Sequence, residues 1–302
     1  MIVVIGATGH TGSTLAEKLL EKGLKVRAVG RDEGRLDPLK RKGAEPFVAD
    51  VTDAKGLARA FSGAEAVYAM IPPNVASPNV LEYQNRVSDA IAAAIEQAGI
   101  TQAVVLSSIG AEKPDKTGPV VGLHSLEKKL ESINRLNVVF LRAGYFMENI
   151  LPQIGVIQSF GMMAGPVSSD LALPMIATRD IGSAAAEILA ACAIQGKQRR
   201  ELLGERDVTY TQVAKAVGST IGKPDLQYRQ MPPAQLRPAL TQMGMSANMA
   251  DLLLEMSDSL NSGYMRALEP RSKGNTTSTS IEEFVADVFA PAYQARAAGA
   301  GR

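Results

Sequence analysis

The chain has 302 residues, enough for a large hydrophobic core in one α/β domain with a smaller second lobe. Its 32 Lys and Arg residues against 31 Asp and Glu residues give a net charge of +1, so no long-range field favours nucleic acid or an anionic membrane. The single cysteine, Cys192, excludes an intramolecular disulfide and a cysteine metal cluster, and its alanine-rich surroundings predict a buried, unreactive thiol. We expect no metal site. Because no apolar run approaches the length of a membrane span and the first predicted strand begins at Met1, we expect a cytoplasmic protein.

The first stretch of the chain, Met1 to Gly12, has the order of a buried strand followed by a glycine turn. Its first residues are apolar and mostly β-branched, as in a parallel strand, and the amphipathic run Ser13 to Lys22 predicts a helix after the turn. This order favours a pyrophosphate, because glycines let the backbone approach the ligand and free N–H groups at the helix N-terminus attract the anion. The spacing G-x-x-G-x-x-G matches the general dinucleotide motif only in part, so a tight turn in another kind of α/β protein is the alternative. The expected pyrophosphate-binding residues are Gly6, Ala7, Thr8, Gly9, His10, Thr11 and Gly12.

Strands and helices alternate through the first half of the chain, which predicts a doubly wound parallel sheet of the Rossmann type. The further expected strands are Lys25–Val29, Glu45–Ala49, Ala66–Ile71, Ala103–Leu106 and Asn137–Leu141. The expected helices are Ala54–Phe61, Val80–Gln97, which stops at Gly99, and Leu123–Ile133.

The alternation loosens after Gly144, and the second half predicts a small, mostly helical lobe. The expected helices are Phe146–Phe160, Asp180–Ala193 with Asp180 as its cap, Thr209–Val217, Pro233–Met243, Ala247–Leu260 and a last one opened by the capping box Ser280–Glu283. Met162 to Met175 is expected to be irregular or to form short extended pieces. We expect a dinucleotide-binding domain over residues 1–155 and a substrate-binding lobe over residues 156–302, interleaved with the first domain around residues 178–204. The methionines of the lobe either line a pocket for flat apolar molecules or belong to an ordinary core.

The residues that follow the second strand indicate which dinucleotide is bound. In such folds an acidic residue at this position bonds the ribose 2′-hydroxyl, whereas an arginine pairs with a 2′-phosphate. Arg31 stands at the end of this strand, in Val29-Gly30-Arg31, with Arg35 one helical turn further, which favours NADP(H). Asp32 is the counter-argument for NAD(H), since a one-residue slip would place its carboxylate at the ribose, and Arg31 as a solvated loop charge is the other alternative.

The candidate catalytic residues lie on the helix after the fifth strand, which itself ends in Ser107-Ser108. A short-chain dehydrogenase has Tyr-x-x-x-Lys here, in which the tyrosine donates a proton and the lysine holds the nicotinamide ribose. In this chain His124 takes the place of the tyrosine, with Lys128 four residues on and Lys129 as the alternative lysine. A histidine can transfer protons near neutral pH, although His124 as a plain residue near the start of the helix is an equal alternative.

Several segments together carry a family resemblance. They are Gly6 to Gly12, Arg31, Asp50-Val51, His124 to Lys129, Leu141 to Asn149, Thr178 to Ile181 and the pattern from Gly204 to Gly263. They resemble the NmrA-like group of atypical short-chain dehydrogenases, which includes NAD(P)H-dependent quinone, azo-dye and triphenylmethane-dye reductases and also catalytically silent redox-sensing regulators. The resemblance implies that Asp50 and Val51 flank the adenine. It further implies that Met70, Ile71 and Pro72 line the path to the ribose and that Gly144, Tyr145 and Phe146 meet the nicotinamide end.

The sequence therefore predicts an NADPH-preferring oxidoreductase that transfers hydride to a quinone-like or other small conjugated acceptor. The alternative from another class is a non-catalytic NADP(H)-binding redox sensor that acts through a protein partner. An isomerase or epimerase of the same superfamily is a third hypothesis, against which the missing tyrosine argues. We expect a small apolar or conjugated substrate and no binding to nucleic acid or membranes. The sequence is compatible with a homo-oligomer.

Overall fold

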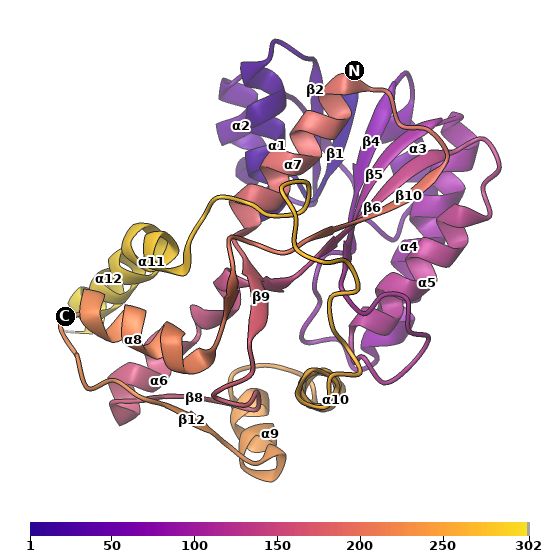
Figure 1. Ribbon diagram of the computed structural model, residues 1–302. Helices are drawn as coiled ribbons and strands as arrows, with labels where there is room; N and C mark the ends of the chain where they lie inside the picture. The colour runs from indigo at the N-terminus through magenta and orange to yellow at the C-terminus, as the bar shows by residue number, and fades with distance from the viewer. Residues whose placement is uncertain (301–302) are drawn as a thin grey trace.

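The computed structural model describes residues 1–300, and residues 301 and 302, the end of the expected second lobe, lie outside the described part (Figure 1). Its centre is a seven-stranded sheet in which every pair of neighbouring strands is parallel. In spatial order the strands are β10 (Lys197–Leu202), β6 (Asn137–Ala143), β5 (Gln102–Ser108), β4 (Ala66–Ala69), β1 (Ile2–Ile5), β2 (Val26–Gly30) and β3 (Glu45–Val48). The predicted doubly wound fold is confirmed.

Helices cover both faces of this sheet (Figure 1). One face carries α1 (His10–Glu21), α2 (Asp37–Arg41) and α7 (Thr178–Ala191), and the other carries α3 (Ala54–Phe61), α4 (Val80–Ala98) and α5 (Val120–Glu131). A short 3-10 turn, Gly34–Leu36, precedes α2.

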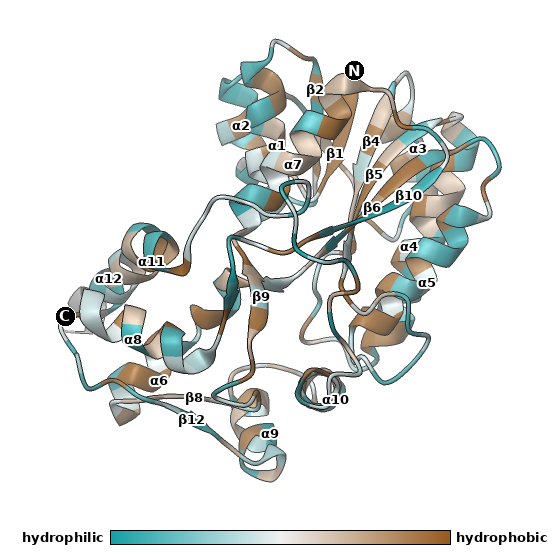
Figure 2. Ribbon diagram, viewed as in Figure 1, coloured by the Kyte–Doolittle hydropathy of each residue, from teal (hydrophilic) through white to brown (hydrophobic). Residues whose placement is uncertain are grey.

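The central strand β1 explains why the sheet is buried on both sides. Its four residues are all buried, and successive side chains of a strand point to opposite faces. Val3 and Ile5 therefore join the core under α3, α4 and α5, while Ile2 and Val4 join the core under α1 and α7. Figure 2 shows the inner strands in brown, as expected for a two-sided core.

Helix α7 packs unusually closely on α1, although the two are far apart in the sequence. A Cβ atom on Gly182 would lie 2.6 Å from the backbone oxygen of Thr11 and 2.9 Å from Cβ of Thr14. Only glycine allows this approach, so Gly182 fixes the spacing of the helix pair behind the glycine turn.

The rest of the chain forms a second lobe with its own hydrophobic core, placed at the carboxyl edge of the sheet (Figure 1). Its strands are β7 (Tyr145–Phe146), β8 (Met163–Gly165), β9 (Leu173–Ile176), β11 (Asp207–Val208) and β12 (Tyr228–Gln230), in the sheets β11-β9-β7 and β12-β8. Its helices are η2 (Met147–Ile150), α6 (Gln153–Phe160), α8 (Tyr210–Thr220), α9 (Pro233–Gln242), α10 (Ala247–Asn261), α11 (Ile281–Phe284), η3 (Val285–Phe289) and α12 (Ala290–Ala300).

Two predictions about α7 were wrong. Asp180 does not cap this helix, because its carboxylate accepts hydrogen bonds from the backbone N–H (3.1 Å) and hydroxyl (2.8 Å) of Thr279. The carboxylate of Glu148 bonds the first turn instead, accepting from the backbone N–H of Thr178 at 3.0 Å and from its hydroxyl at 2.5 Å. Cys192 is exposed, because α7 ends at Ala191 and the chain leaves it there through the left-handed conformation, with φ +46° at Cys192.

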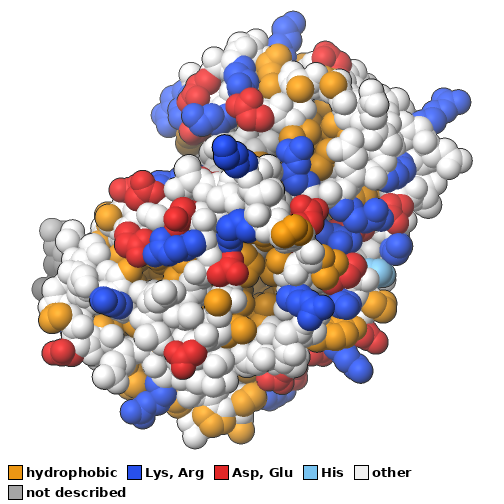
Figure 3. All heavy atoms as spheres, in the orientation of Figure 1, with side chains coloured by type: hydrophobic (Ala, Val, Ile, Leu, Met, Phe, Trp, Pro, Cys, Tyr) orange, Lys and Arg blue, Asp and Glu red, His pale blue; other side chains and the backbone are white. Residues whose placement is uncertain are grey.

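The expected helix over residues 146–160 was also wrong in its first half, where β7 and η2 precede the shorter α6. The edge strand β10 was missed, since its sequence, Lys-Gln-Arg-Arg-Glu-Leu, has no apolar run. Charged side chains of both signs are interspersed over the face drawn in Figure 3. Among the described residues, no helix combines the length and the apolar character that a bilayer crossing requires.

Candidate cofactor and active site

The glycine turn joins the carboxyl end of β1 to the N-terminus of α1. Gly6 adopts φ +69°, a conformation that suits glycine, and its backbone oxygen accepts a 2.9 Å hydrogen bond from the N–H of Gly9. Gly9 is the N-cap of α1 and carries no side chain that could cap the helix, and the first turn holds no acidic residue. The first N–H groups of α1 are thus available to an anion, as in other nucleotide-binding turns.

Two further glycines have different roles in this turn. A Cβ atom on Gly12 would lie 2.3 Å from the backbone oxygen of Gly6, so Gly12 lets the helix pack directly against the turn. A Cβ atom on Gly9 would meet only that same oxygen, at 3.3 Å, and otherwise stands in open space. The turn therefore leaves room above Gly9, and the residues present fit a dinucleotide pyrophosphate.

The arginines after β2 lie beside this turn. The Arg35 guanidinium donates a 3.3 Å hydrogen bond to the backbone oxygen of Thr8, and a Cβ atom on Gly30 would lie 3.4 Å from the Thr8 side chain. Arg31 is exposed, and its side chain makes no hydrogen bond or ion pair with any other residue in the described part of the chain. Asp32, the alternative ribose ligand, accepts a 3.3 Å bond from the backbone N–H of Arg35. The arrangement leaves the Arg31 charge available to a 2′-phosphate.

Asp50 and Tyr83 lie within electrostatic range of Arg31. The hydroxyl of Thr52 and its backbone N–H donate to the Asp50 carboxylate at 2.6 and 2.8 Å, and these bonds, with a smaller contribution from Arg31, lower the pKa of Asp50. Burial raises the pKa of the Tyr83 hydroxyl. The charge of Arg31 lowers this pKa and the charge of Asp50 raises it. Val51 is buried in the core beneath this group. Sequence reasoning did not place Tyr83 near Arg31, and its position in the first turn of α4 was the only available signal.

The end of β4 closes the turn on its other side. A Cβ atom on Gly6 would lie 2.8 Å from the sulfur of Met70, so Met70 packs directly on the glycine turn. Ile71 is buried in the core, and Pro72 is half-buried at the start of the following loop. Met70 is therefore next to the turn, and the path to the ribose along Met70, Ile71 and Pro72 stays a prediction.

Gly144, Tyr145 and Phe146 follow β6 at the same edge of the sheet. A Cβ atom on Gly144 would lie 2.1 Å from the backbone oxygen of Pro174, so this glycine allows β9 to lie against the end of β6. The hydroxyl of Tyr210 donates a 3.1 Å hydrogen bond to that of Tyr145, and the Tyr210 ring stacks on Tyr228 at 4.3 Å. Burial raises the pKa of all three tyrosines. The segment is thereby anchored to the second lobe.

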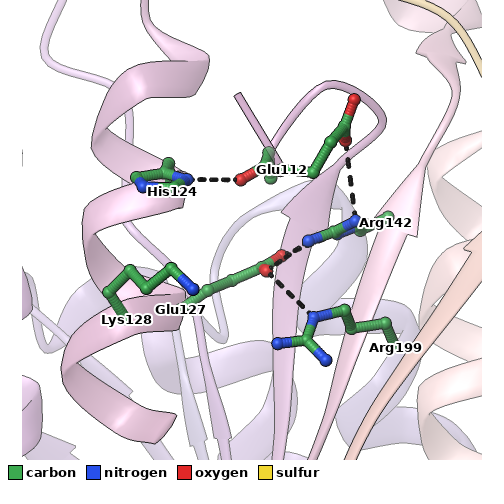
Figure 4. Close-up of a pocket in the computed structure, with 7 residues that line it drawn as sticks. Glu112, His124, Glu127, Lys128, Arg142 and Arg199 are labelled. Atoms are coloured by element: carbon green, nitrogen blue, oxygen red, sulfur yellow. Dashed lines mark hydrogen bonds and ion pairs between the residues drawn. The ribbon is translucent and has the colours of Figure 1, made fainter. Parts of the chain in front are cut away.

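His124 and Lys128 lie on one side of α5 and line a cavity of about 270 Å³ (Figure 4). Nδ1 of His124 lies 2.8 Å from the backbone oxygen of Ala111, which can only accept, so Nδ1 carries a proton and Nε2 is left for other partners. Lys128 is 62% exposed and bonds Glu131 at 3.2 Å. Lys129 turns away to α4, where it bonds Asp89 at 2.5 Å. The described residues that line this cavity include none of the glycine turn.

A buried ion pair forms the floor of that cavity (Figure 4). The Glu127 carboxylate, 3% exposed, accepts bonds from Arg142 at 3.0 and 2.7 Å and from the Ser107 hydroxyl at 2.5 Å. Burial lowers the pKa of Arg142, but its bonds to Glu127 more than offset this and the net shift is upward. Glu112 lies 3.5 Å from Arg142, and Arg199 lies 3.9 Å from Glu127. Sequence reasoning missed this pair, although a charged residue inside the apolar strand β6 was a signal for it.

No three His, Cys, Asp or Glu side chains gather to hold a metal ion anywhere in the described part of the chain.

The chain resembles known proteins both in sequence and in fold. A model of the NmrA-like family matches residues 1–285. The NAD(P)H azoreductase of Xenophilus azovorans is 26% identical over 258 residues, which cover 85% of this chain and 86% of that protein. The NADPH-dependent quinone oxidoreductase QOR2 of Escherichia coli, complexed with NADPH, superposes with a TM-score of 0.78 at 24% identity over 96% of this chain and 100% of that one. NmrA, a negative transcriptional regulator, superposes with a TM-score of 0.67 at 18% identity over 98% of this chain and 97% of its own.

Proposed function

This chain belongs to the NmrA-like family, and we propose that it is an NADP(H)-dependent oxidoreductase that reduces a quinone-like or other small conjugated acceptor. The observation that carries the proposal is the uncapped N-terminus of α1 over an open glycine turn, with Arg35 bonded to Thr8 and Arg31 beside it. The azoreductase and the quinone oxidoreductase, whose names state NAD(P)H and NADPH, support the cofactor. NAD(H) is the alternative cofactor.

Each part of the site has an assigned role in this proposal. Residues 6–12 hold the pyrophosphate, Arg31 and Arg35 hold the 2′-phosphate, and Asp50 and Val51 flank the adenine. Met70, Ile71 and Pro72 line the path to the ribose, while Gly144, Tyr145 and Phe146 meet the nicotinamide. Residues 1–155 form the cofactor-binding domain, residues 178–204 return to it, and the rest of residues 156–302 covers the nicotinamide.

NADPH bound here would supply a hydride, that is, one proton together with two electrons, from C4 of its nicotinamide. The protein's task is then to hold the acceptor beside that carbon and to exclude water. One proton completes the reduction of a quinone-like acceptor, and water or a weak acid is sufficient for it. The roles of His124 as that acid and of Lys128, with Lys129 as its alternative, as a contact of the nicotinamide ribose stay predictions.

Stopped-flow measurement of NADPH oxidation with a panel of quinones and dyes tests the function. A reductase oxidises bound NADPH in a single turnover that depends on the acceptor. Tight NADPH binding without oxidation by any acceptor would contradict the proposal.

A redox sensor is the second candidate, favoured by the fold shared with a transcriptional regulator and by the absence of the Tyr-x-x-x-Lys tyrosine at position 124. A sensor binds NADP⁺ and NADPH without turnover and changes its affinity for a protein partner with the oxidation state of the nucleotide. The same stopped-flow experiment separates the two candidates.

A further inference from the structure

A second cavity, of about 210 Å³, lies between the end of β5, strand β9 and the segment that follows α10. Its walls are mainly apolar and include Ile109, Leu173, Leu260 and Met265. Drug-sized ligands usually occupy cavities of about 300–1,000 Å³, so this one suits a molecule of one or two rings. Nothing in the proposed cofactor site uses it.

This cavity lies next to the residue that the proposed function places at the nicotinamide. Its wall residue Pro174 lies against Gly144, whose Cβ would be 2.1 Å from the Pro174 oxygen. Its wall residue Ile109 donates a 3.0 Å backbone hydrogen bond to Ala143, which directly precedes Gly144. Two walls of the cavity are thus built from the immediate neighbours of Gly144.

The charged residues that line the cavity are Asp207 and Arg266. The Asp207 carboxylate is bonded by the guanidinium of Arg271, so its charge is compensated. Arg266 is exposed, and the structure records no hydrogen bond or ion pair for its side chain among the described residues. The uncompensated charge of the lining is therefore positive.

We propose that this cavity is the acceptor site and that its natural acceptor is a flat, apolar molecule carrying an acidic substituent that Arg266 binds. The inference rests on the proposed function. Carboxylate, sulfonate and phosphate share the required chemistry, since each accepts charge-assisted hydrogen bonds from a guanidinium. The apolar walls hold the ring system, and Arg266 selects the orientation that directs the conjugated end toward Gly144.

The probes are a naphthoquinone that carries a propanoate chain and its methyl ester, which differ by one negative charge. The quantity measured is kcat/KM with NADPH for the wild type and for Arg266→Gln, Arg266→Glu and the control Arg229→Gln. Arg229 is an exposed arginine on β12 that does not line the cavity. Because Arg266 is exposed, Arg266→Gln is expected to lower kcat/KM for the propanoate by about three- to tenfold. The ester should change less than about twofold, and Arg266→Glu should lower the propanoate value further.

The pattern across variants decides the proposal. A rise in the propanoate KM with ionic strength, absent for the ester and for Arg266→Gln, would support it. Equal changes for the two quinones, or a loss of the same size in Arg229→Gln, would overturn it. If neither quinone oxidises NADPH, calorimetric titration of the NADP⁺-bound protein with the propanoate separates the two questions. Binding that Arg266→Gln weakens supports the cavity while the reductase function fails, and absence of binding overturns the cavity.

Discussion

The Arg35 guanidinium and the Thr8 backbone oxygen, 3.3 Å apart, connect the loop after β2 to the glycine turn. The side chain that is expected to read the 2′-phosphate next to Arg31 is thus already fixed to the backbone that is expected to hold the pyrophosphate. Pre-positioning of this kind reduces the conformational entropy that binding has to overcome.

Substitution of the two arginines should affect the two cofactors differently. Arg31→Ala should weaken NADPH by about 1.5 kcal/mol, roughly tenfold in Kd, and leave NADH unchanged, because only NADPH has the phosphate and the exposed site screens the charge. Arg35→Ala should weaken both, since it also frees the Thr8 carbonyl. Fluorescence titration of NADPH and NADH, with exposed Arg41→Ala as control, measures these effects. Equal losses of NADH and NADPH in Arg31→Ala would show that Arg31 does not recognise the phosphate.

Two glycine substitutions should separate binding from folding. Gly9→Val should abolish dinucleotide binding but leave the fold intact, because its side chain stands in the open space above the turn. Gly12→Ala should instead destabilise the protein, on the order of 1–3 kcal/mol, because its Cβ would lie 2.3 Å from the Gly6 oxygen. Circular dichroism, urea unfolding and NADPH titration give both quantities. A folded Gly9→Val protein with unchanged affinity would refute the assignment of the turn.

Alanine variants of α5 test the catalytic hypothesis. Lys128→Ala should weaken NADPH about three- to tenfold if this lysine reaches the ribose after releasing Glu131. Lys129→Ala serves as the matched comparison, because Lys129 is bonded to Asp89. His124→Ala should lower turnover less than about tenfold, below the roughly hundredfold or greater effect of an obligatory general acid, since water can protonate a reduced quinone. Single-turnover rates and NADPH dissociation constants decide, and unchanged affinity in both lysine variants and in their combination would end the ribose-anchor hypothesis.

Breaking the Glu127–Arg142 ion pair should lower the free energy of unfolding more than replacing its charges with apolar groups. Glu127→Gln removes the carboxylate that accepts both hydrogen bonds from Arg142 and leaves only Glu112, at 3.5 Å, as a counter-charge, so the free energy of unfolding should fall by about 2–4 kcal/mol. The variant Glu127→Leu with Arg142→Met and Glu112→Gln should recover much of this loss, because none of the three charges is then desolvated. Urea unfolding of the single and triple variants is the measurement. A triple variant less stable than Glu127→Gln would mean that the pair itself is strongly stabilising.

Glu201 should make stability depend on pH. Burial raises the pKa of this carboxyl on β10, even though the backbone N–H groups of Leu268 and Glu269 donate to it. The folded protein thus binds this proton more tightly than the unfolded chain. The contribution is fully present below the unfolded pKa, about 4.3, and is lost as pH rises through the higher folded pKa. Relative to the non-titrating Glu201→Gln, wild-type stability should therefore fall with increasing pH in urea titrations, and a pH-independent difference would contradict the shift.

The sheet was predictable from sequence because its inner strands are apolar runs bounded by turn residues, and Gly99 ends α4 in the left-handed conformation as expected. Strand β10 was not predictable, since an edge strand needs few apolar residues and its pairing with β6 is a long-range contact. The Asp180 prediction was wrong for a related reason. A local capping rule cannot see that Thr279, almost a hundred residues later, takes up the carboxylate.

The candidate site divides in the same way. The placement of Gly6 to Gly12 and Arg31 at one edge of the sheet follows from local spacing, because a turn and the adjacent strand end are close in sequence or at one sheet edge. The surroundings of His124 did not follow, since Arg142, Glu112 and Arg199 reach the cavity from three other segments. Residue spacing on α5 placed His124 and Lys128 on one side of the helix, as the structure has them, but not the partners they meet there.

The contact of Gly182 on α7 with Thr11 on α1 also has a consequence for the order in which the protein can be made. Thr11 precedes Gly182 by 171 residues, so the glycine turn leaves the ribosome well before the helix that braces it, and the edge strand β10 follows later still. A nascent chain that ends before Thr178 would expose Leu15 and Leu19 of α1, which are fully buried in the finished core. Such intermediates expose hydrophobic surface of the kind that chaperones cover, and a fragment made to isolate the nucleotide-binding half would need to extend through Leu202 to keep α7 and β10.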